Sequence, residues 1–170
     1  MLYHLTYHYS IGLHINHLVF LHAYVVAVFV IFCGAGLATG VPYLDFVFPA
    51  LFAIAIFAYS AKLGGLYSIP YWGIVSALLS ITTAFLQPWL GDYVMCLIVG
   101  FSLMLFAFIC QLIGHAMHEV FQAPPNFLHG FFAAPVLEWF SLLLRLGLMP
   151  TENSRELWAR VDALRQSSLQ

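Results

Sequence analysis

Residues 18–38, with the sequence LVFLHAYVVAVFVIFCGAGLA, contain no Asp, Glu, Lys or Arg side chain. A helix needs about 20 mostly apolar residues to cross the hydrocarbon core of a bilayer, and this stretch meets that requirement. Three further apolar runs follow at residues 46–61, 71–86 and 93–118, separated by segments that contain Gly and Pro. The sequence therefore predicts an all-α integral membrane protein with about four transmembrane helices, the last long enough to project beyond the bilayer.

The composition of the whole chain agrees with a membrane protein. Of its 170 residues, 63% are hydrophobic and 7% are charged, and the mean hydropathy is +0.94. Soluble domains are about 25% charged, so most of the surface of this chain cannot face water. Five basic residues are also too few to form the basic face of a nucleic-acid-binding protein. A soluble globule and a nucleic-acid binder are thus excluded, and the expected partner is the lipid bilayer.

A fifth apolar stretch, residues 131–149, contains two charged side chains and is predicted to be re-entrant or to lie along the interface. Residues 151–170 are polar, with apolar residues at helical spacing, which predicts an amphipathic surface helix. The chain thus divides into a membrane-embedded domain, residues 1–150, and a surface tail, residues 151–170. Lys62 and the tail arginines share one side if the first four stretches cross. The positive-inside rule then places that side, with both termini, in the cytoplasm.

The chain holds eight histidines, which form two groups in the sequence. An ionisable side chain at membrane depth is costly and marks a functional site by default. In a chain that crosses four times, the two groups share one membrane face. The first group is His4, His8, His14, His17 and His22, and the second is His115, His118 and His129.

The spacing at the end of the fourth apolar stretch suits a metal site. His115, His118 and Glu119 are at positions i, i+3 and i+4, which places their side chains on one face of a helix. Two imidazoles and one carboxylate with open coordination positions are the ligand pattern of non-haem Fe(II) oxygenases. Glu119 can act as a ligand, as the group that orients a ligand histidine, or as a solvated acid.

In the first group, His14 and His22 are the candidate metal ligands. On a continuous helix, eight residues rise about 12 Å, which is too far for both side chains to bind one ion directly. Either His14 lies in a turn that folds back before the helix, or two ions are bound. Of the remaining histidines, His4 and His129 are interpreted as interface residues. His8 and His17 stay without an assigned role.

Motifs in these regions resemble those of a known family. They are Tyr9-x4-His14-x7-His22 at the start of the chain, then Gln111-x2-Gly114-His115-x3-Glu119, Ala134-Pro135 and Arg145-Leu-Gly-Leu-Met-Pro150. In this order they resemble the small membrane family of 2-hydroxy-fatty-acid dioxygenases, long catalogued as a domain of unknown function. The resemblance extends from about Tyr9 to Pro150, and the middle stretches share only their hydropathy.

The resemblance implies an iron-dependent enzyme of fatty-acid α-oxidation. In that reaction a 2-hydroxy fatty acid and O2 react, and the acid becomes one carbon shorter. The resemblance implies metal-binding or catalytic roles for His14, His22 and His115, to which the helical spacing adds His118. Eukaryotic relatives lie in the endoplasmic reticulum, and a bacterial one would lie in the inner membrane.

Fe(II) is the expected cofactor, since a 2-hydroxy acid can chelate it through the hydroxyl and one carboxylate oxygen. The candidate catalytic residues are Glu119, to which the resemblance gives an unassigned polar role, and Arg145. The Arg145 guanidinium can bind the substrate carboxylate or extend toward lipid phosphate. Glu138 is expected to pair with a polar neighbour rather than to act in catalysis.

Three other functions fit parts of this pattern. A di-iron fatty-acid hydroxylase or desaturase would use histidine boxes, which the His-x3-His and His-x2-His spacings faintly resemble. A haem carrier would pair its histidines and show a Soret band. A transporter or assembly factor would bind no metal and would keep its function when His115 is replaced by Ala.

Overall fold

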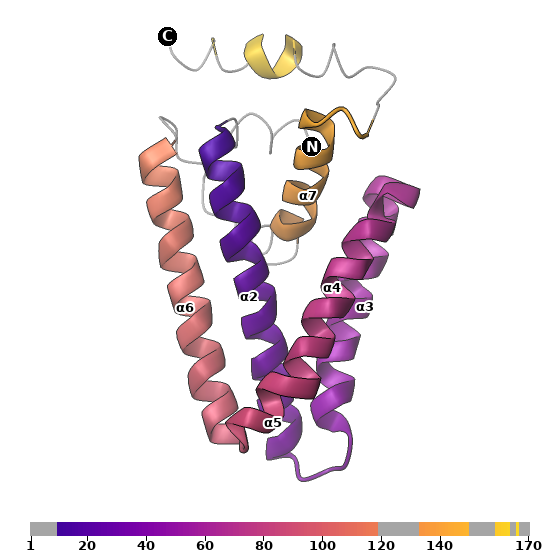
Figure 1. Cartoon of the computed structure of the whole chain (residues 1–170), viewed down its shortest axis with the longest axis vertical. Coiled ribbons are helices and arrows are strands. Elements are labelled where there is room, and N and C mark those ends of the chain that lie inside the picture. Colours follow the sequence, from indigo (N-terminus) through magenta and orange to yellow (C-terminus); the bar gives the residue numbers. More distant parts are fainter. Residues whose placement is uncertain (1–9, 119–132, 150–158, 164–165, 167–170) are drawn as a thin grey trace.

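The computed structural model describes residues 10–118, 133–149, 159–163 and 166, and its elements in these residues are all helical (Figure 1). The prediction of an all-α chain is confirmed for this part of the molecule. In chain order the elements are α2 (Ile11–Ala38), α3 (Leu44–Gly64), the 3₁₀ turn η1 (Gly65–Ser68), α4 (Ile69–Ile81), the π-helical turn η2 (Thr82–Leu86), α5 (Gln87–Leu90), α6 (Tyr93–His118) and α7 (Ala134–Arg145).

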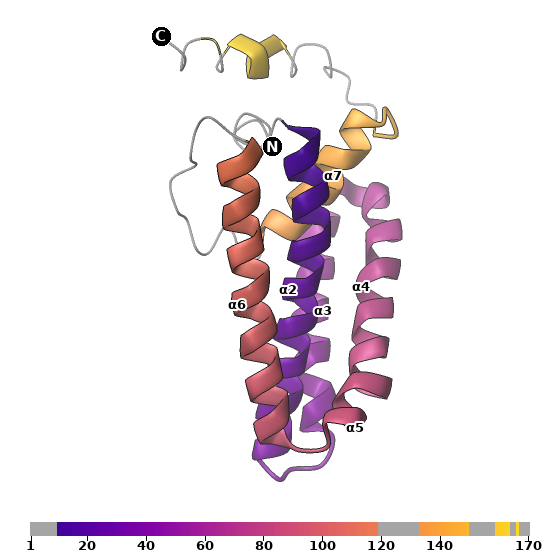
Figure 2. The same ribbon diagram turned by 60° about the vertical axis from the view of Figure 1, so that its left-hand side comes forward.

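In the described part of the chain, three helical segments are long and apolar enough to cross a membrane: Ile11–Ala38, Leu44–Leu90 and Tyr93–His118. The middle segment comprises 47 residues and bends at its two adjacent glycines, so that α3 and α4 lie side by side in opposite directions (Figures 1 and 2). Gly65 has a φ of +53°, a backbone conformation that glycine adopts without the steric cost of a Cβ. The glycines and the proline of residues 62–70 predict a turn, and the chain does reverse there, through the end of α3 and the turn η1.

The first membrane helix begins earlier than the sequence predicted. It was expected to start at Leu18, and it starts at Ile11, directly after Ser10. The Ser10 hydroxyl accepts a hydrogen bond from the backbone N–H of Leu13, which satisfies one of the free N–H groups of the first turn. His14 therefore lies inside a continuous helix, and the alternative in which it folds back from a turn before the helix is wrong.

The third apolar stretch also ends later than predicted. It was expected to stop at Gln87-Pro88, and the helical path continues through η2 and α5 to Leu90. Pro88 lies in the first turn of α5, where a backbone N–H has no helical partner to lose. The π turn before it adds a residue to the helix and accommodates the proline. The prediction for α6, residues 93–118, is confirmed within the described residues.

The apolar core joins four helices. Phe29 of α2 and Phe52 of α3 meet edge to face, with ring centroids 5.9 Å apart, and Val75 of α4 and Phe140 of α7 complete the same buried cluster. On the other side of α2, Gly100 of α6 lies so close that a Cβ there would meet the Ile31 side chain at 2.6 Å. Small residues let membrane helices approach closely, and α2 thus packs against α6 as well as against α3 and α7.

The fifth apolar stretch forms α7, which is buried beside α2 and α3 (Figures 1 and 2). Its 12 residues rise about 18 Å, which is shorter than the hydrocarbon core of a bilayer. The predicted amphipathic tail lies mostly outside the described residues. Residues 159–163 are helical, and Val161, one of the predicted apolar positions, is buried.

Candidate functional site

The N-terminal end of α2 and the C-terminal end of α6 lie side by side at one end of the bundle (Figures 1 and 2). His17 and His115 meet edge to face, with ring centroids 4.8 Å apart. A Cβ on Gly12 would lie 2.6 Å from the His118 ring, so this imidazole covers the α2 backbone. The two histidine groups therefore meet at His17 and His115, while His118 lies against the α2 backbone at Gly12.

His14 and Glu138 form a buried pair between α2 and α7. Both side chains are fully buried, and the His14 Nδ1–H donates a hydrogen bond to Glu138 Oε2. This bond fixes the tautomer, since a proton on Nδ1 leaves the lone pair on Nε2. His14 Nε2 is buried and has no hydrogen-bond partner among the described residues. The expected pairing of Glu138 with a polar neighbour is confirmed, and the neighbour is a predicted metal ligand.

His22 shows the same arrangement with a backbone partner. Its Nδ1–H donates to the Leu18 carbonyl at 2.5 Å, which again leaves the lone pair on Nε2. That Nε2 is buried without a hydrogen-bond partner in the described part of the chain. The His22 ring meets the Tyr71 ring of α4 at a centroid distance of 5.8 Å, and the Tyr71 hydroxyl is likewise buried with no described partner.

On the α6 side of α2, the polar side chains are hydrogen bonded or partly exposed, unlike the buried nitrogens of His14 and His22. Asn16 Nδ2 donates to the Cys110 carbonyl of α6 at 3.1 Å, and Asn16 Oδ1 lies 3.4 Å from His17 Nδ1. His115 is half-buried and His118 is exposed. Polar side chains on this side are therefore engaged with one another or open to the surroundings.

The four predicted metal ligands are not brought together. His14 faces α7 and His22 faces α4, whereas His115 and His118 belong to α6 on the opposite side of α2. In residues 10–118 and the other described segments, no three His, Cys, Asp or Glu side chains are arranged to hold one ion. The structure thus divides the predicted ligands into two pairs.

Of the two predicted catalytic residues, Arg145 is the last residue of α7 and is half-buried. It follows Glu138 by seven residues, a rise of about 10 Å along the helix. A cation at this end also complements the helix dipole. Glu119, the other catalytic candidate, lies outside the described residues. So do three further histidines: His4, His8 and His129.

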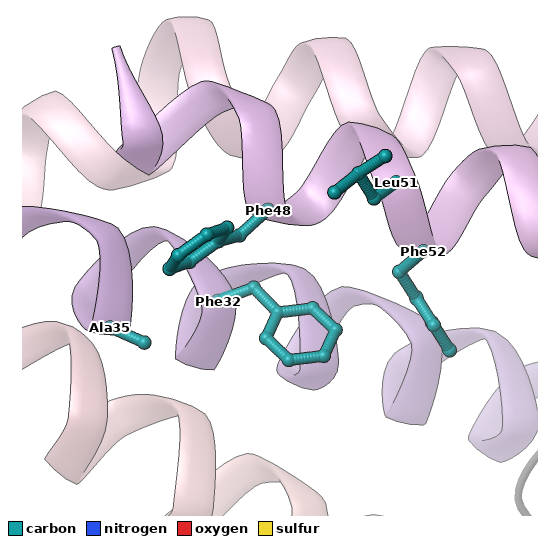
Figure 3. Close-up of a pocket in the computed structure, with 5 residues that line it drawn as sticks. All are labelled: Phe32, Ala35, Phe48, Leu51 and Phe52. Carbon is teal, nitrogen blue, oxygen red and sulfur yellow. The ribbon is translucent and has the colours of Figure 1, made fainter. Parts of the chain in front are cut away.

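A separate apolar hollow lies between α2 and α3, and Figure 3 shows its lining. Its volume is about 370 Å³, and the side chains around it are hydrocarbon. Of the α2 residues that line it, Phe32 is nearest to the histidines. Phe32 follows His22 by ten residues, which is a rise of about 15 Å along the helix. The hollow can contact acyl chains but offers no group for chemistry. It is lined by Phe32, Ala35, Phe48, Leu51 and Phe52.

Sequence reasoning missed Tyr71 and Trp139 as parts of this site. The Tyr71 ring is stacked on the Trp139 ring of α7 at a centroid distance of 5.9 Å, and thereby connects His22 with the helix that carries Glu138. Both aromatic residues fit the expected core or interface of a membrane protein, so their sequence positions give no signal. Only the packing of α4 against α2 and α7 identifies them.

No family model, curated protein or solved structure matches this chain.

Proposed function

We propose that this protein is a membrane-embedded, Fe(II)-dependent dioxygenase that shortens 2-hydroxy fatty acids by one carbon. The observation that carries the proposal is the buried pair of His14 and Glu138. Metal-binding histidines characteristically donate their second ring N–H to a carboxylate or a backbone carbonyl. His14 makes the first of these contacts and His22 makes the second.

The residues fit an iron ion by their donor chemistry. His14 Nε2 and His22 Nε2 are buried nitrogen lone pairs without a described partner, and neutral imidazole is a common ligand of Fe(II). His14 would hold the ion, and His22, about 12 Å further along the continuous helix α2, would not bind the same ion directly and would lie beside the substrate. His115 and His118 would be metal ligands only in the two-iron alternative. Iron would supply the activation of O2.

The chain's own residues supply the rest of the site. Glu138 keeps the His14 proton on Nδ1, so that Nε2 stays available. Arg145 attracts the substrate carboxylate, and Glu119 is the second polar candidate. The apolar helices exclude water, and a long acyl chain stays in the lipid while its head group reaches the buried histidines.

The reaction has a defined stoichiometry. The C1–C2 bond of the 2-hydroxy acid breaks, C2 becomes the carboxyl carbon of the shortened acid, and C1 leaves as CO2. One O2 is the oxidant, and it is reduced while one water is formed. Substrate, O2 and products therefore balance without another reductant.

The proposal includes a four-crossing topology. α2, α3, α4 with α5, and α6 would cross, α7 would remain in the leaflet beside the histidines, and both termini would face the cytoplasm. The support is the bend between α3 and α4 and the short length of α7. The membrane would be the bacterial inner membrane or the endoplasmic reticulum.

The test is iron content and substrate turnover of protein purified in detergent and loaded anaerobically with Fe(II). We expect about one iron per chain at the His14 side, and O2 uptake with release of labelled CO2 from 2-hydroxypalmitate carrying the label at C1. Palmitate, which lacks the hydroxyl, should give neither. Glu138→Gln should weaken iron binding about 10- to 100-fold, as expected for the partner of a ligand histidine.

Asp92→Asn is the matched control for Glu138→Gln. Asp92 Oδ1 accepts from the Met95 N–H at the far end of α6, so removing this charge should leave iron binding unchanged. Absence of iron in the wild-type protein after loading would refute the proposal. Two irons per chain would favour the histidine-box hydroxylase, and a Soret band would favour the haem carrier.

A further inference from the structure

The Tyr71 hydroxyl is a buried polar group that the fold itself does not use. Tyr71 is fully buried, and its hydroxyl has no hydrogen-bond partner among the described residues. Burying a hydroxyl without a partner is unfavourable, and a Phe would fill the same space without that cost. A tyrosine at this position therefore points to a ligand that accepts its hydrogen bond.

The surroundings of Tyr71 limit where that ligand binds. One side of the ring is stacked on Trp139, with planes 28° apart. The His22 ring meets it edge to face, and the His22 Nε2 is also buried without a described partner. The Tyr71 and His22 rings are thus in contact within an apolar core. Tyr71 offers a hydrogen-bond donor there, its O–H, and His22 offers the lone pair on Nε2.

We propose that Tyr71 is a specificity-determining residue whose O–H donates a hydrogen bond to the 2-hydroxyl oxygen of the substrate beside His22. The identity of the ligand rests on the proposed function, whereas the contact between the two rings does not. A site that hydrogen bonds a substrate hydroxyl discriminates strongly against the analogue without it, because its own polar group is then left unpaired. Tyr71 would in this way separate 2-hydroxy acids from the ordinary fatty acids of the bilayer.

The experiment measures binding rather than turnover. The iron-loaded protein is kept free of O2 in nanodiscs, and the dissociation constants of radiolabelled 2-hydroxypalmitate and palmitate are compared for wild type and Tyr71→Phe. We expect wild type to prefer the 2-hydroxy acid, and Tyr71→Phe to reduce this preference about tenfold, the loss of one buried hydrogen bond. Affinity for palmitate should not fall.

A stability measurement separates this role from a structural one. Since the hydroxyl has no described partner, Tyr71→Phe should keep or raise the melting temperature of the ligand-free protein. A lower melting temperature with an unchanged preference for the 2-hydroxy acid would overturn the proposal, because the hydroxyl would then serve the fold. Tyr59→Phe makes the same chemical change at a half-buried position of α3 and should alter neither quantity.

The outcomes distinguish this inference from the proposed function. If wild type and Tyr71→Phe prefer the 2-hydroxy acid equally, Tyr71 does not recognise the hydroxyl, and the dioxygenase proposal stands. If wild type binds both acids equally, the substrate assignment is wrong, and with it the proposed role of Tyr71.

Discussion

The buried pair of His14 and Glu138 predicts that single and double substitutions have opposite consequences. Glu138→Leu removes the hydrogen bond from the buried His14 imidazole, and His14→Phe removes the same bond from the buried Glu138 carboxylate. Removing one partner of a buried pair costs about 3–5 kcal/mol of stability. Replacing both partners with apolar residues of similar volume is often neutral or stabilising. We therefore expect each single variant to lose about 3 kcal/mol, and the double variant to be about as stable as wild type.

The structure sets this magnitude. Both side chains are 0% exposed, so water does not solvate the polar group that a single substitution leaves behind. Helix α7 keeps its position in the double variant, because Val136 and Phe140 anchor it in the apolar core. With these losses, the coupling free energy between the two positions has a magnitude of about 6 kcal/mol, which exceeds the range of about 0.5–3 kcal/mol usual for residues in contact.

The assay is unfolding in mixed micelles, followed by tryptophan fluorescence, together with iron content. The double variant should fold like wild type and bind no iron on the His14 side, which separates the stability of the pair from its function. Ser141→Ala is the control on the same helix, and it should cost about 1 kcal/mol, because it removes the hydrogen bond that the hydroxyl donates to the Leu137 carbonyl within α7. Single-variant losses that add within about 0.5 kcal/mol in the double variant would refute the coupling.

Four further predictions concern the helices that position the site. Ser10→Ala removes the N-terminal cap of α2 and should cost about 1 kcal/mol in the same unfolding assay. Gly36→Ala should cost about 1–3 kcal/mol, because the new Cβ would lie 2.3 Å from the backbone nitrogen of Asp45. Gly73→Ala, where a Cβ meets nothing within 4 Å, should instead stabilise by about 0.5–1 kcal/mol, and a loss there would contradict the packing. Asn16→Ala removes the hydrogen bond to α6 and should cost about 0.6–1.7 kcal/mol, the range of interhelical hydrogen bonds in membranes.

The membrane helices could be predicted because hydropathy acts over whole segments. α6 begins at the predicted Tyr93 and is helical through His118, the last described residue of this segment, while the start of α2 was misplaced by seven residues. Gly12, His14 and His17 lower the local hydropathy, although the helix continues through them. Their side of the helix is covered by α6 and α7, and a single sequence contains no direct record of that contact.

The site could be predicted only in part for the same reason. The histidines stand out by type and position, and the meeting of His17 with His115 follows from antiparallel α2 and α6. The pairing of His14 with Glu138 joins residues 124 positions apart and depends on how α7 folds back against α2. Tyr71 carries no compositional signal at all, and its position becomes informative only when the burial of its hydroxyl is known.

The location of the chemistry follows from which buried atoms have partners. On the α6 side of α2, Asn16 is hydrogen bonded and His118 is exposed, so the polar groups there are already accommodated. On the side that faces α4 and α7, Nε2 of His14, Nε2 of His22 and the Tyr71 hydroxyl are buried without described partners. Such atoms are costly in an apolar core unless a ligand satisfies them, and the costs of three such atoms add. The region where α2 contacts α4 and α7 is therefore where the proposed ion and polar head group would restore the missing interactions.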